Sequence, residues 1–300
     1  MKKILIIGGS GFLGSHIADF LSKKNYQVTI FDKKKSNWLK DNQKMITSNM
    51  ENLKKLENAI KNSDIVYHLA AMSDIGECME KPLSSAKINI IFTIKVLEFC
   101  KKYKIERLVF SSTIYVHSSQ GGFYRISKDA AENYVEEYYK RFSLNYTILR
   151  FGTIYGPRSK LNNNLTKIIH LALNKKILEY SGGTSKAVRK FINVKDAAKL
   201  SCEILNKKYK NKHVLITGKK NIKITYIMKL LSKLLKIKSK PQYNKATKYG
   251  HYDISPYSKI KTPEIKINPK NLTDIKAGLI ELINENEPMV TSSLKNIRGN

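Results

Sequence analysis

The sequence predicts an α/β fold of the doubly wound type, with a parallel sheet and a smaller C-terminal lobe. Apolar runs alternate with segments of helical periodicity as far as Phe151, and that rhythm produces parallel sheets with right-handed crossovers. The first run leads directly into a glycine-rich turn and a helix. After Gly156-Pro157 the alternation changes, which marks the start of the second lobe.

The expected strands are short apolar runs bounded by turn residues, and the expected helices carry apolar residues three and four positions apart. The strands cover residues 4–7, 27–32, 44–47, 63–71, 106–113, 145–151 and 213–217. The helices cover residues 12–21, 53–60, 86–103, 124–142, 164–173, 196–205, 224–235 and 272–283. The stretch from Lys238 to Pro269 contains four prolines and is expected to be a loop, and the last residues to be frayed.

The turn after the first strand has the spacing of a dinucleotide-binding loop. Gly8 permits a sharp turn, Gly11 lets the backbone approach a pyrophosphate, and Gly14 lets the helix pack closely on the strand. The helix N-terminus offers free N–H groups and a partial positive charge to phosphates. The second expected strand ends in Asp32, where a carboxylate can accept a hydrogen bond from a ribose 2′-hydroxyl. The two halves together predict a bound dinucleotide.

Asp32 favours NAD over NADP, because a carboxylate at this place repels a 2′-phosphate. The following Lys33, Lys34 and Lys35 weaken that distinction, since a lysine there could pair with such a phosphate. NAD is the predicted cofactor.

The composition predicts a globular protein without a membrane span. The chain has 300 residues, 42% of them hydrophobic, and no run of 18 apolar residues. Its short apolar start, which runs into Gly-Gly, differs from a signal peptide. Cys78, Cys100 and Cys202 are scattered, so neither a disulfide framework nor a metal site is expected. A reducing, cytoplasmic compartment is the expected location.

The formal net charge of +31 comes almost wholly from lysines spread along the chain. Nucleic-acid binders usually concentrate their positive charge, often with arginine and stacking aromatics, so no nucleic-acid partner is expected. A genome-wide base-composition bias is the favoured explanation. The positive surface would still attract anionic ligands, and peripheral attraction to an anionic membrane leaflet stays open.

A hydroxyl, a phenol and an ammonium are placed where a parallel sheet presents its ligands. Thr113 ends the fifth expected strand, and Tyr124 and Lys128 share one face of the next helix because they are four residues apart. Since a free phenol titrates near pH ~10, the nearby ammonium is expected to lower the pKa of Tyr124. A phenolate can then remove a proton from a sugar hydroxyl while hydride leaves the same carbon. The Thr113 hydroxyl would orient that substrate oxygen.

With these residues the chain resembles an extended short-chain dehydrogenase/reductase of the NAD-dependent epimerase/dehydratase family, of which UDP-glucose 4-epimerase is typical. The resemblance spans nearly the whole chain, and the order and spacing of its motifs make it specific. These motifs are GGSGFLG from Gly8, DIVYHLAA from Asp64, the Pro82…Asn89 pair, FSST from Phe110, YRISK from Tyr124, LRFGTIYGPR from Leu149, NNL from Asn163 and RKFINVKDAA from Arg189.

The resemblance implies tightly held NAD, with Tyr124 as the base, Lys128 as its partner and nicotinamide-ribose ligand, and Thr113 as the hydroxyl helper. It implies a nucleotide-diphosphate sugar as substrate, and a homodimer formed through the long helices that include the Tyr124 helix. The residues expected to contact NAD are Gly8, Gly11, Phe12, Leu13, Asp32, Asn49, Leu69, Ala70, Ala71, Asn89, Ser111, Tyr124 and Lys128. The residues expected to contact the substrate are Thr153, Asn164, Arg189 and Lys248.

The chain also departs from the family pattern. Asn49 stands where the family often has an Asp near adenine, and Val116-His117-Ser118 replaces the common Val-Tyr-Gly. The 4,6-dehydratase branch has an acidic pair after its threonine, whereas Ile114-Tyr115 stands here, which argues against dehydration. A second phosphate-binding arginine near the carboxyl end is missing, and Lys248 is the candidate substitute in that region.

Three functional hypotheses follow. The first is an NAD-dependent nucleotide-sugar epimerase, with C4 as the expected carbon, in which the cofactor takes a hydride and returns it. The second is a nucleotide-sugar 4-reductase or dehydrogenase, in which the cofactor exchanges in each cycle. The third is a non-catalytic NAD-binding regulator or nucleic-acid-associated protein, which the intact Thr113, Tyr124 and Lys128 set argues against.

The two lobes are expected to divide the work of binding. Residues 1–157 would form an NAD-binding Rossmann domain, with 190–217 returning to it. Residues 158–189 and 218–300 would form the substrate-binding lobe.

Overall fold

The computed structural model describes residues 1–244, 264–267, 269 and 271–297. The chain divides into two compact units. Unit 1 comprises Met1–Phe151, Ala197–Ile216 and Pro256–Asn268, and unit 2 comprises Gly152–Asp196, Thr217–Ser255 and Pro269–Asn300.

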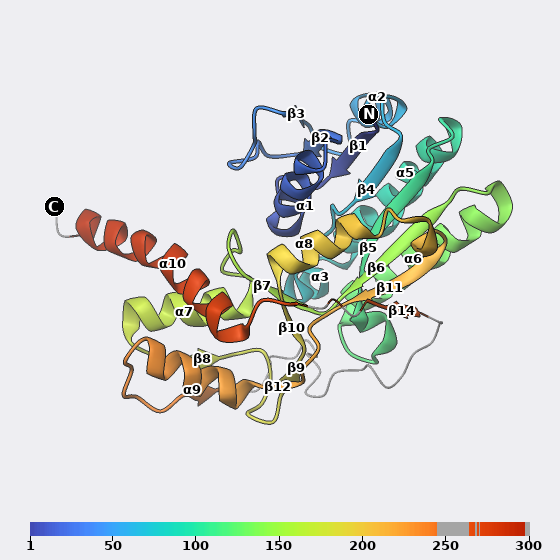
Figure 1. The fold of residues 1–300 in the computed structure, drawn as a ribbon. Coiled ribbons are helices and arrows are strands. Elements are labelled where there is room, and N and C mark those ends of the chain that lie inside the picture. The colour runs from blue at the N-terminus through green and yellow to red at the C-terminus, as the bar shows by residue number, and fades with distance from the viewer. Residues whose placement is uncertain (245–263, 268, 270, 298–300) are drawn as a thin grey trace. The chain divides into compact units, whose positions relative to one another are not determined.

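Unit 1 is built on an eight-stranded sheet in the order β14-β11-β6-β5-β4-β1-β2-β3, with every pairing parallel (Figure 1). The order along the chain reverses at β1, between β2 and β4. This is the predicted doubly wound fold, in which ligands bind beyond the carboxyl ends of the strands at the switch point. The strands are β1 (Lys3–Ile7), β2 (Gln27–Asp32), β3 (Gln43–Thr47), β4 (Ile65–His68), β5 (Arg107–Thr113), β6 (Tyr146–Phe151), β11 (Lys212–Ile216) and β14 (Glu264–Lys266).

Both faces of this sheet are buried, which is why its strands read as continuous apolar runs. On one face, Leu5 and Ile7 of β1 join a core with apolar side chains of α2, α5 and α6. On the other face, the Tyr67 hydroxyl donates to the Ser201 carbonyl of α8. The helical elements that unit 1 contains wholly or in part are α1 (Phe12–Lys23), α2 (Leu53–Lys61), α3 (Ile75–Glu80), α4 (Pro82–Ala86), η1 (Lys87–Ile91), α5 (Phe92–Lys102), η2 (Ile114–His117), α6 (Gly122–Phe142), α8 (Val194–Glu203) and η3 (Lys207–Tyr209).

The helix expected over 86–103 is longer and less regular than the sequence indicated. It begins at Pro82 as α4, passes through one π-helical turn, η1, and continues as α5. The wider turn places the Asn89 side chain inside, where its amide pairs with the Met72 backbone. Apolar periodicity does not reveal a π-turn, because such a turn inserts a single residue into an otherwise regular helix.

Unit 2 is smaller, and its described residues form three short strand pairs and three complete helices with a core of their own. Leu165, Ile169, Ile227, Leu231 and Leu279 are buried together in that core. The pairs are β7 (Thr153–Tyr155) with β10 (Phe191–Asn193), β8 (Glu179–Tyr180) with β13 (Gln242–Tyr243), and β9 (Val188–Arg189) with β12 (Ile222–Lys223). The helices are α7 (Asn164–Lys175), α9 (Ile224–Leu234) and α10 (Ile275–Ile297).

Two expectations for the C-terminal part were wrong. The stretch 238–269, expected to be loop throughout, contains β13 and β14. These strands have two and three residues, too few to show an alternating pattern. The last helix begins at Ile275, where Asp274 accepts hydrogen bonds from the backbone N–H groups of Lys276 and Ala277. It extends to Ile297, well beyond the expected end at 283.

The contact between α1 and β1 gives a test of the fold. A Cβ added at Gly14 would lie 2.3 Å from the Gly8 carbonyl oxygen, so Gly14→Ala must push helix and strand apart. We expect this substitution to lower the free energy of unfolding by about 1–3 kcal/mol in urea titrations. The matched control is Gly76→Ala in α3, where the nearest atom is a side-chain oxygen at 3.1 Å and the change should stay within about 1 kcal/mol. Equal stability of the two variants would contradict the close packing.

Candidate active site

The glycine-rich turn closes the first strand as sharply as the sequence requires. Gly8 has a φ of +90°, and a Cβ there would lie 2.6 Å from the Ala70 nitrogen. Its own N–H donates to the Phe31 carbonyl of β2 at 2.8 Å. The turn is thus fixed between the ends of β2 and β4, where only glycine can follow the backbone.

The N-terminus of α1 fits a pyrophosphate. Gly11 precedes the helix in an extended conformation without a side-chain cap, and no acidic residue lies in the first turn. In the described part of the chain, a Cβ at Gly11 would meet only the Gly8 carbonyl within 4 Å, at 3.2 Å. The space beside the helix is therefore open. The first helical residues, Phe12 and Leu13, present backbone N–H groups at the positive end of the helix dipole.

Asp32 is fixed beside the same turn, at the end of β2. One carboxylate oxygen accepts from the Ser10 N–H at 3.1 Å and the other from the Lys34 N–H at 3.1 Å. Each oxygen keeps a further lone pair for a ribose hydroxyl. Lys33, Lys34 and Lys35 are exposed.

The segment after β4 is tied to β1 and to the π-turn. The N–H groups of Leu69 and Ala70 both donate to the Ile7 carbonyl, at 2.8 and 2.9 Å. Asn89 accepts from the Met72 N–H at 2.8 Å, and it donates to the Met72 carbonyl at 3.0 Å and to the Ser127 hydroxyl at 2.9 Å. Asn89 therefore fixes the strand end that contains Leu69, Ala70 and Ala71, and its own contact with NAD stays a prediction.

Asn49 and Ser111 differ in their surroundings. Asn49 is exposed beyond β3 and bonds with Glu51 through its amide nitrogen, at 3.3 Å. Ser111 is partly exposed on β5, two residues before Thr113 and therefore on the same face of the strand. The NAD contacts expected of both residues stay predictions.

The structure brings Thr113 and Tyr124 together. Thr113 ends β5, and its hydroxyl accepts from the Tyr115 N–H at 3.3 Å, which caps η2. The Thr113 hydroxyl also lies close enough to the Tyr124 phenol, in the first turn of α6, to lower the pKa of that phenol. The Tyr115 ring packs edge-on against the Tyr124 ring, with 6.3 Å between centroids. Lys128 lies one turn further along α6 and is 2% exposed.

The expectation that the Lys128 ammonium lowers the pKa of Tyr124 was wrong. Burial raises the pKa of Tyr124 to about 12, and the nearby Thr113 hydroxyl offsets only part of this. Burial also lowers the pKa of Lys128 to about 7, although Glu132 opposes the change. The sequence argument considered the pair's mutual attraction, whereas the desolvation of both charged forms dominates here.

Lys128 lies against an aromatic face. Its ammonium is 4.2 Å from the centroid of the Phe110 ring on β5, a geometry that favours the charged form. The buried Cys78 thiol is close enough to raise the pKa of both Tyr124 and Lys128. No sequence motif pointed to Cys78, because its neighbours in space come from α6.

The substrate-contact candidates that the structure describes lie in unit 2, and two of them meet at the Gly182 turn. The buried Arg189 guanidinium donates to the carbonyl groups of Gly182 and Val188, at 3.1 and 3.0 Å. A Cβ on Gly182 would lie 2.6 Å from the Asn164 amide nitrogen, so that side chain borders the same turn. Thr153 begins β7 and pairs with Phe191 of β10, two residues after Arg189. Lys248 lies outside the described residues.

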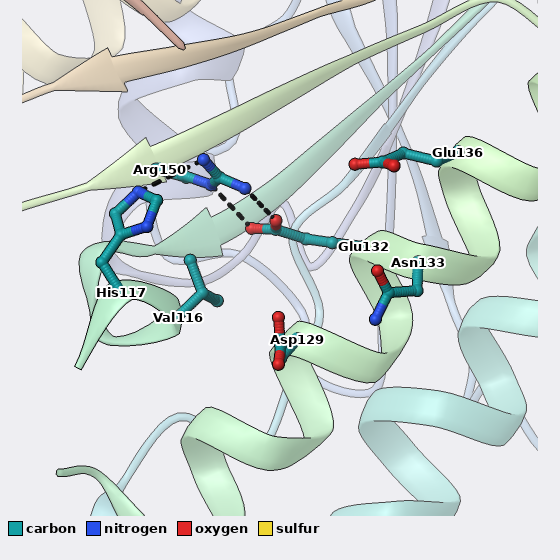
Figure 2. Close-up of a pocket in the computed structure, with 7 residues that line it drawn as sticks. All are labelled: Val116, His117, Asp129, Glu132, Asn133, Glu136 and Arg150. Atoms are coloured by element: carbon teal, nitrogen blue, oxygen red, sulfur yellow. Dashed lines mark hydrogen bonds and ion pairs between the residues drawn. The ribbon is translucent and has the colours of Figure 1, made fainter. Parts of the chain in front are cut away.

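The sequence did not reveal a buried group of charged side chains between α6 and β6. Arg150 of β6 makes two hydrogen bonds with Glu132 of α6, at 3.1 and 2.5 Å, and its guanidinium lies 3.2 Å from His117 (Figure 2). A cavity of about 240 Å³ adjoins these groups. One signal was visible, since Glu132 follows Lys128 by one helical turn. The cavity is lined by Val116, His117, Asp129, Glu132, Asn133, Glu136 and Arg150.

The described residues contain neither a metal cluster nor a membrane-spanning helix. Among the described residues, no group of three or more His, Cys, Asp or Glu side chains could hold a metal ion. In the same part of the chain, no helix is long and apolar enough to cross a bilayer.

The chain matches the NAD dependent epimerase/dehydratase family over residues 4–217. It belongs to this family. The resemblance predicted from the motifs is therefore confirmed, and so is NAD as the cofactor, by which the family is described. The glycine turn and Asp32 lie within the matched range.

The relatives include enzymes of more than one kind. A Methanocaldococcus jannaschii protein provisionally named a UDP-glucose 4-epimerase is 27% identical over 303 aligned positions, which cover 94% of this chain and 97% of that protein. A dTDP-D-glucose 4,6-dehydratase of Dictyostelium discoideum is 32% identical over 244 positions, which cover 69% of this chain and 56% of that protein.

The solved UDP-glucose 4-epimerase of Thermotoga maritima, in its complex with UDP-glucose, has the same fold. It superposes with a TM-score of 0.83 at 23% identity, over 96% of this chain and 99% of that one. The match confirms the predicted Rossmann-type fold.

The low pKa of Lys128 predicts how stability depends on pH. In nucleotide-free protein, Lys128 is neutral above about pH 7 when folded but stays protonated to about pH 10 when unfolded. Since the unfolded chain binds the extra proton in this window, the stability contributed by this site rises with pH there. Relative to Lys128→Met, wild-type protein should gain up to about 1.4 kcal/mol per pH unit, measured by urea unfolding at several pH values. Parallel curves for the two proteins would refute the low pKa.

Proposed function

We propose that the chain is an NAD-dependent nucleotide-sugar 4-epimerase with Tyr124 as its base. The observation that carries the proposal is the closeness of the Thr113 hydroxyl to the Tyr124 phenol, whose pKa it lowers, with Lys128 one turn along the same helix. This arrangement lies in the same unit as the glycine turn and Asp32. The family and the M. jannaschii relative support epimerase chemistry.

Each of the three groups has a separate part in the proposed reaction. Tyr124 removes the proton from the sugar hydroxyl at C4, and Thr113 donates a hydrogen bond to the same oxygen and orients it. When bound, NAD supplies a hydride acceptor and, in its oxidised form, a positive charge that favours the phenolate. The Lys128 ammonium also favours the phenolate, and Lys128 binds the nicotinamide ribose. After rotation of the keto sugar, return of the hydride to C4 and of the proton from Tyr124 to the oxygen would complete the inversion without net oxidation.

The diphosphate of the substrate is assigned to unit 2. Arg189 is always charged and presents several donors in a planar arrangement suited to phosphate oxygens. Two of its hydrogen bonds go to the carbonyl groups of Gly182 and Val188. Asn164 and Thr153 are proposed to contact the nucleotide and the sugar, and Lys248 to add a point charge.

Dehydration and net reduction are the competing activities within the family. Ile114 and Tyr115 form η2 directly after Thr113, so no carboxyl group at these two positions can act as the acid for loss of water. A reductase or dehydrogenase must release its cofactor in each cycle, whereas an epimerase retains it. Co-purification of NAD, detected after denaturation, therefore separates these two activities.

A homodimer is proposed through the helices that flank the site. Large apolar side chains are exposed on α4, η1 and α6, which contact one another along their lengths. Leu83 is 86% exposed, and such a group of apolar residues on adjacent helices is typical of a protein interface. The residues are Leu83, Ile91, Phe123, Ile126 and Tyr134.

Tyr124→Phe tests the proposed base. Wild-type protein should epimerise one class among UDP-, GDP-, CDP- and dTDP-sugars, followed by chromatography of the product sugars. The variant should lose about 100- to 10,000-fold in kcat, because it keeps the ring but cannot take the proton. NAD content, measured after denaturation, should stay unchanged.

Tyr115→Phe is the matched control, since it removes a neighbouring phenol oxygen and keeps the ring packed against Tyr124. Its kcat should stay near the wild-type value. Undiminished turnover in Tyr124→Phe would remove Tyr124 from the mechanism.

The dimer is tested by placing charge in the apolar group. Wild-type protein should show twice the chain mass in light scattering after gel filtration. The double substitution Ile91→Glu with Tyr134→Glu should give the mass of one chain, because two carboxylates would be buried without partners. Tyr226→Glu, at an exposed tyrosine of α9, should leave the mass unchanged. A wild-type protein of single-chain mass would end the proposal.

A further inference from the structure

His117 and Glu264 join distant parts of unit 1 behind the candidate site. The His117 Nε2 atom lies 3.3 Å from a Glu264 carboxylate oxygen, and both lie near the Arg150 guanidinium, at 3.2 and 3.4 Å. The three side chains are almost fully buried. Glu264 begins the edge strand β14, His117 ends η2, and Arg150 comes from β6 between them in the chain.

The charges in this cluster are fixed by one another. Burial raises the pKa of Glu264, but the His117 hydrogen bond and the Arg150 charge lower it below its ordinary value, so the carboxylate stays ionised. On its other side, Arg150 pairs with Glu132 of α6 (Figure 2). Removing one partner from such a buried network leaves another charge uncompensated, so the remaining groups must move or take in water.

The cluster reaches the candidate catalytic groups through η2, which is only one turn long. Its first residue follows Thr113, its Tyr115 ring packs against the Tyr124 ring, and its last residue is His117. Tyr115 also limits the start of α6, since a Cβ on Gly121 would lie 2.7 Å from that ring. A shift of His117 would therefore move Tyr115, whose ring packs against the Tyr124 ring.

We propose that His117 and Glu264, with Arg150, form a positioning clasp that fixes η2 and so aligns Thr113 and Tyr124 for proton transfer. The proposal rests on the epimerase function proposed above. His117 and Glu264 are positioning residues, since they act through Tyr115 and touch no reacting atom. The clasp also makes β14, which sequence patterns did not reveal, a part of the catalytic unit.

Kinetics of clasp variants give the first test. We expect His117→Ala and Glu264→Gln to lower kcat by about 10- to 100-fold, with KM and NAD content near wild-type values. His117→Gln, which keeps a donor and an acceptor, should recover part of the loss. Combining His117→Ala with Tyr115→Ala should cost no more than the larger single effect, because both act along one route.

The matched control is His213→Ala. His213 is also a buried histidine beside carboxylates, Glu136 of α6 at 2.7 Å and Glu132 at 3.7 Å, but it lies on β11 and not on η2. The His213→Ala variant should lose thermal stability, as the clasp variants do, but its kcat should stay near the wild-type value. If the clasp variants lose only stability and keep kcat while Tyr124→Phe is inactive, the clasp is refuted and the epimerase function stands.

A second measurement does not depend on turnover. In protein labelled with ¹³C at the tyrosine Cζ, the Tyr124 signal is assigned by its loss in Tyr124→Phe. We expect this signal to shift in His117→Ala and Glu264→Gln and to keep its position in His213→Ala. An unchanged signal in the clasp variants would overturn the proposal, even if no nucleotide sugar proves to be a substrate.

Discussion

The desolvation of Lys128, which is buried, and of Tyr124, which is partly buried, is the constraint on which the rest of the site depends. Desolvation moves the two pKa values in opposite directions, to about 12 and about 7, and so favours the neutral form of each group. A phenol with this pKa is a poor base at neutral pH. Bound NAD would supply a positive charge that favours the phenolate, in addition to a hydride acceptor.

The sequence predicted those parts of the fold whose signals are local. The first strand, the glycine turn and Asp32 lie within the first 32 residues. Each of these features makes a steric or electrostatic demand that a particular type of residue meets. The alternation of strands and helices, which is also a local signal, predicted the parallel sheet. Thr113, Tyr124 and Lys128 were found together because a strand end and the following helix are close in sequence and in space.

The remaining features depend on residues that are distant in sequence or on burial. Arg150 and Glu264 are separated by 114 positions, and neither residue type in its own segment points to the other. Asn89 faces Met72 only because a π-turn interrupts its helix. The predicted direction of the Tyr124 pKa shift was wrong, because residue spacing shows which charges are neighbours but not how strongly burial desolvates them.

The role of Tyr124 as the base is tested most directly in a single turnover, by the rate at which a nucleotide sugar reduces bound NAD. This rate is measured at several pH values from the absorbance of the reduced nicotinamide. If Tyr124 is the base, the rate should rise with pH as one group ionises and then level off. In Tyr124→Phe the remaining slow rate should lack that ionisation. A wild-type rate that does not vary with pH, or a variant that keeps the wild-type profile, would contradict the account.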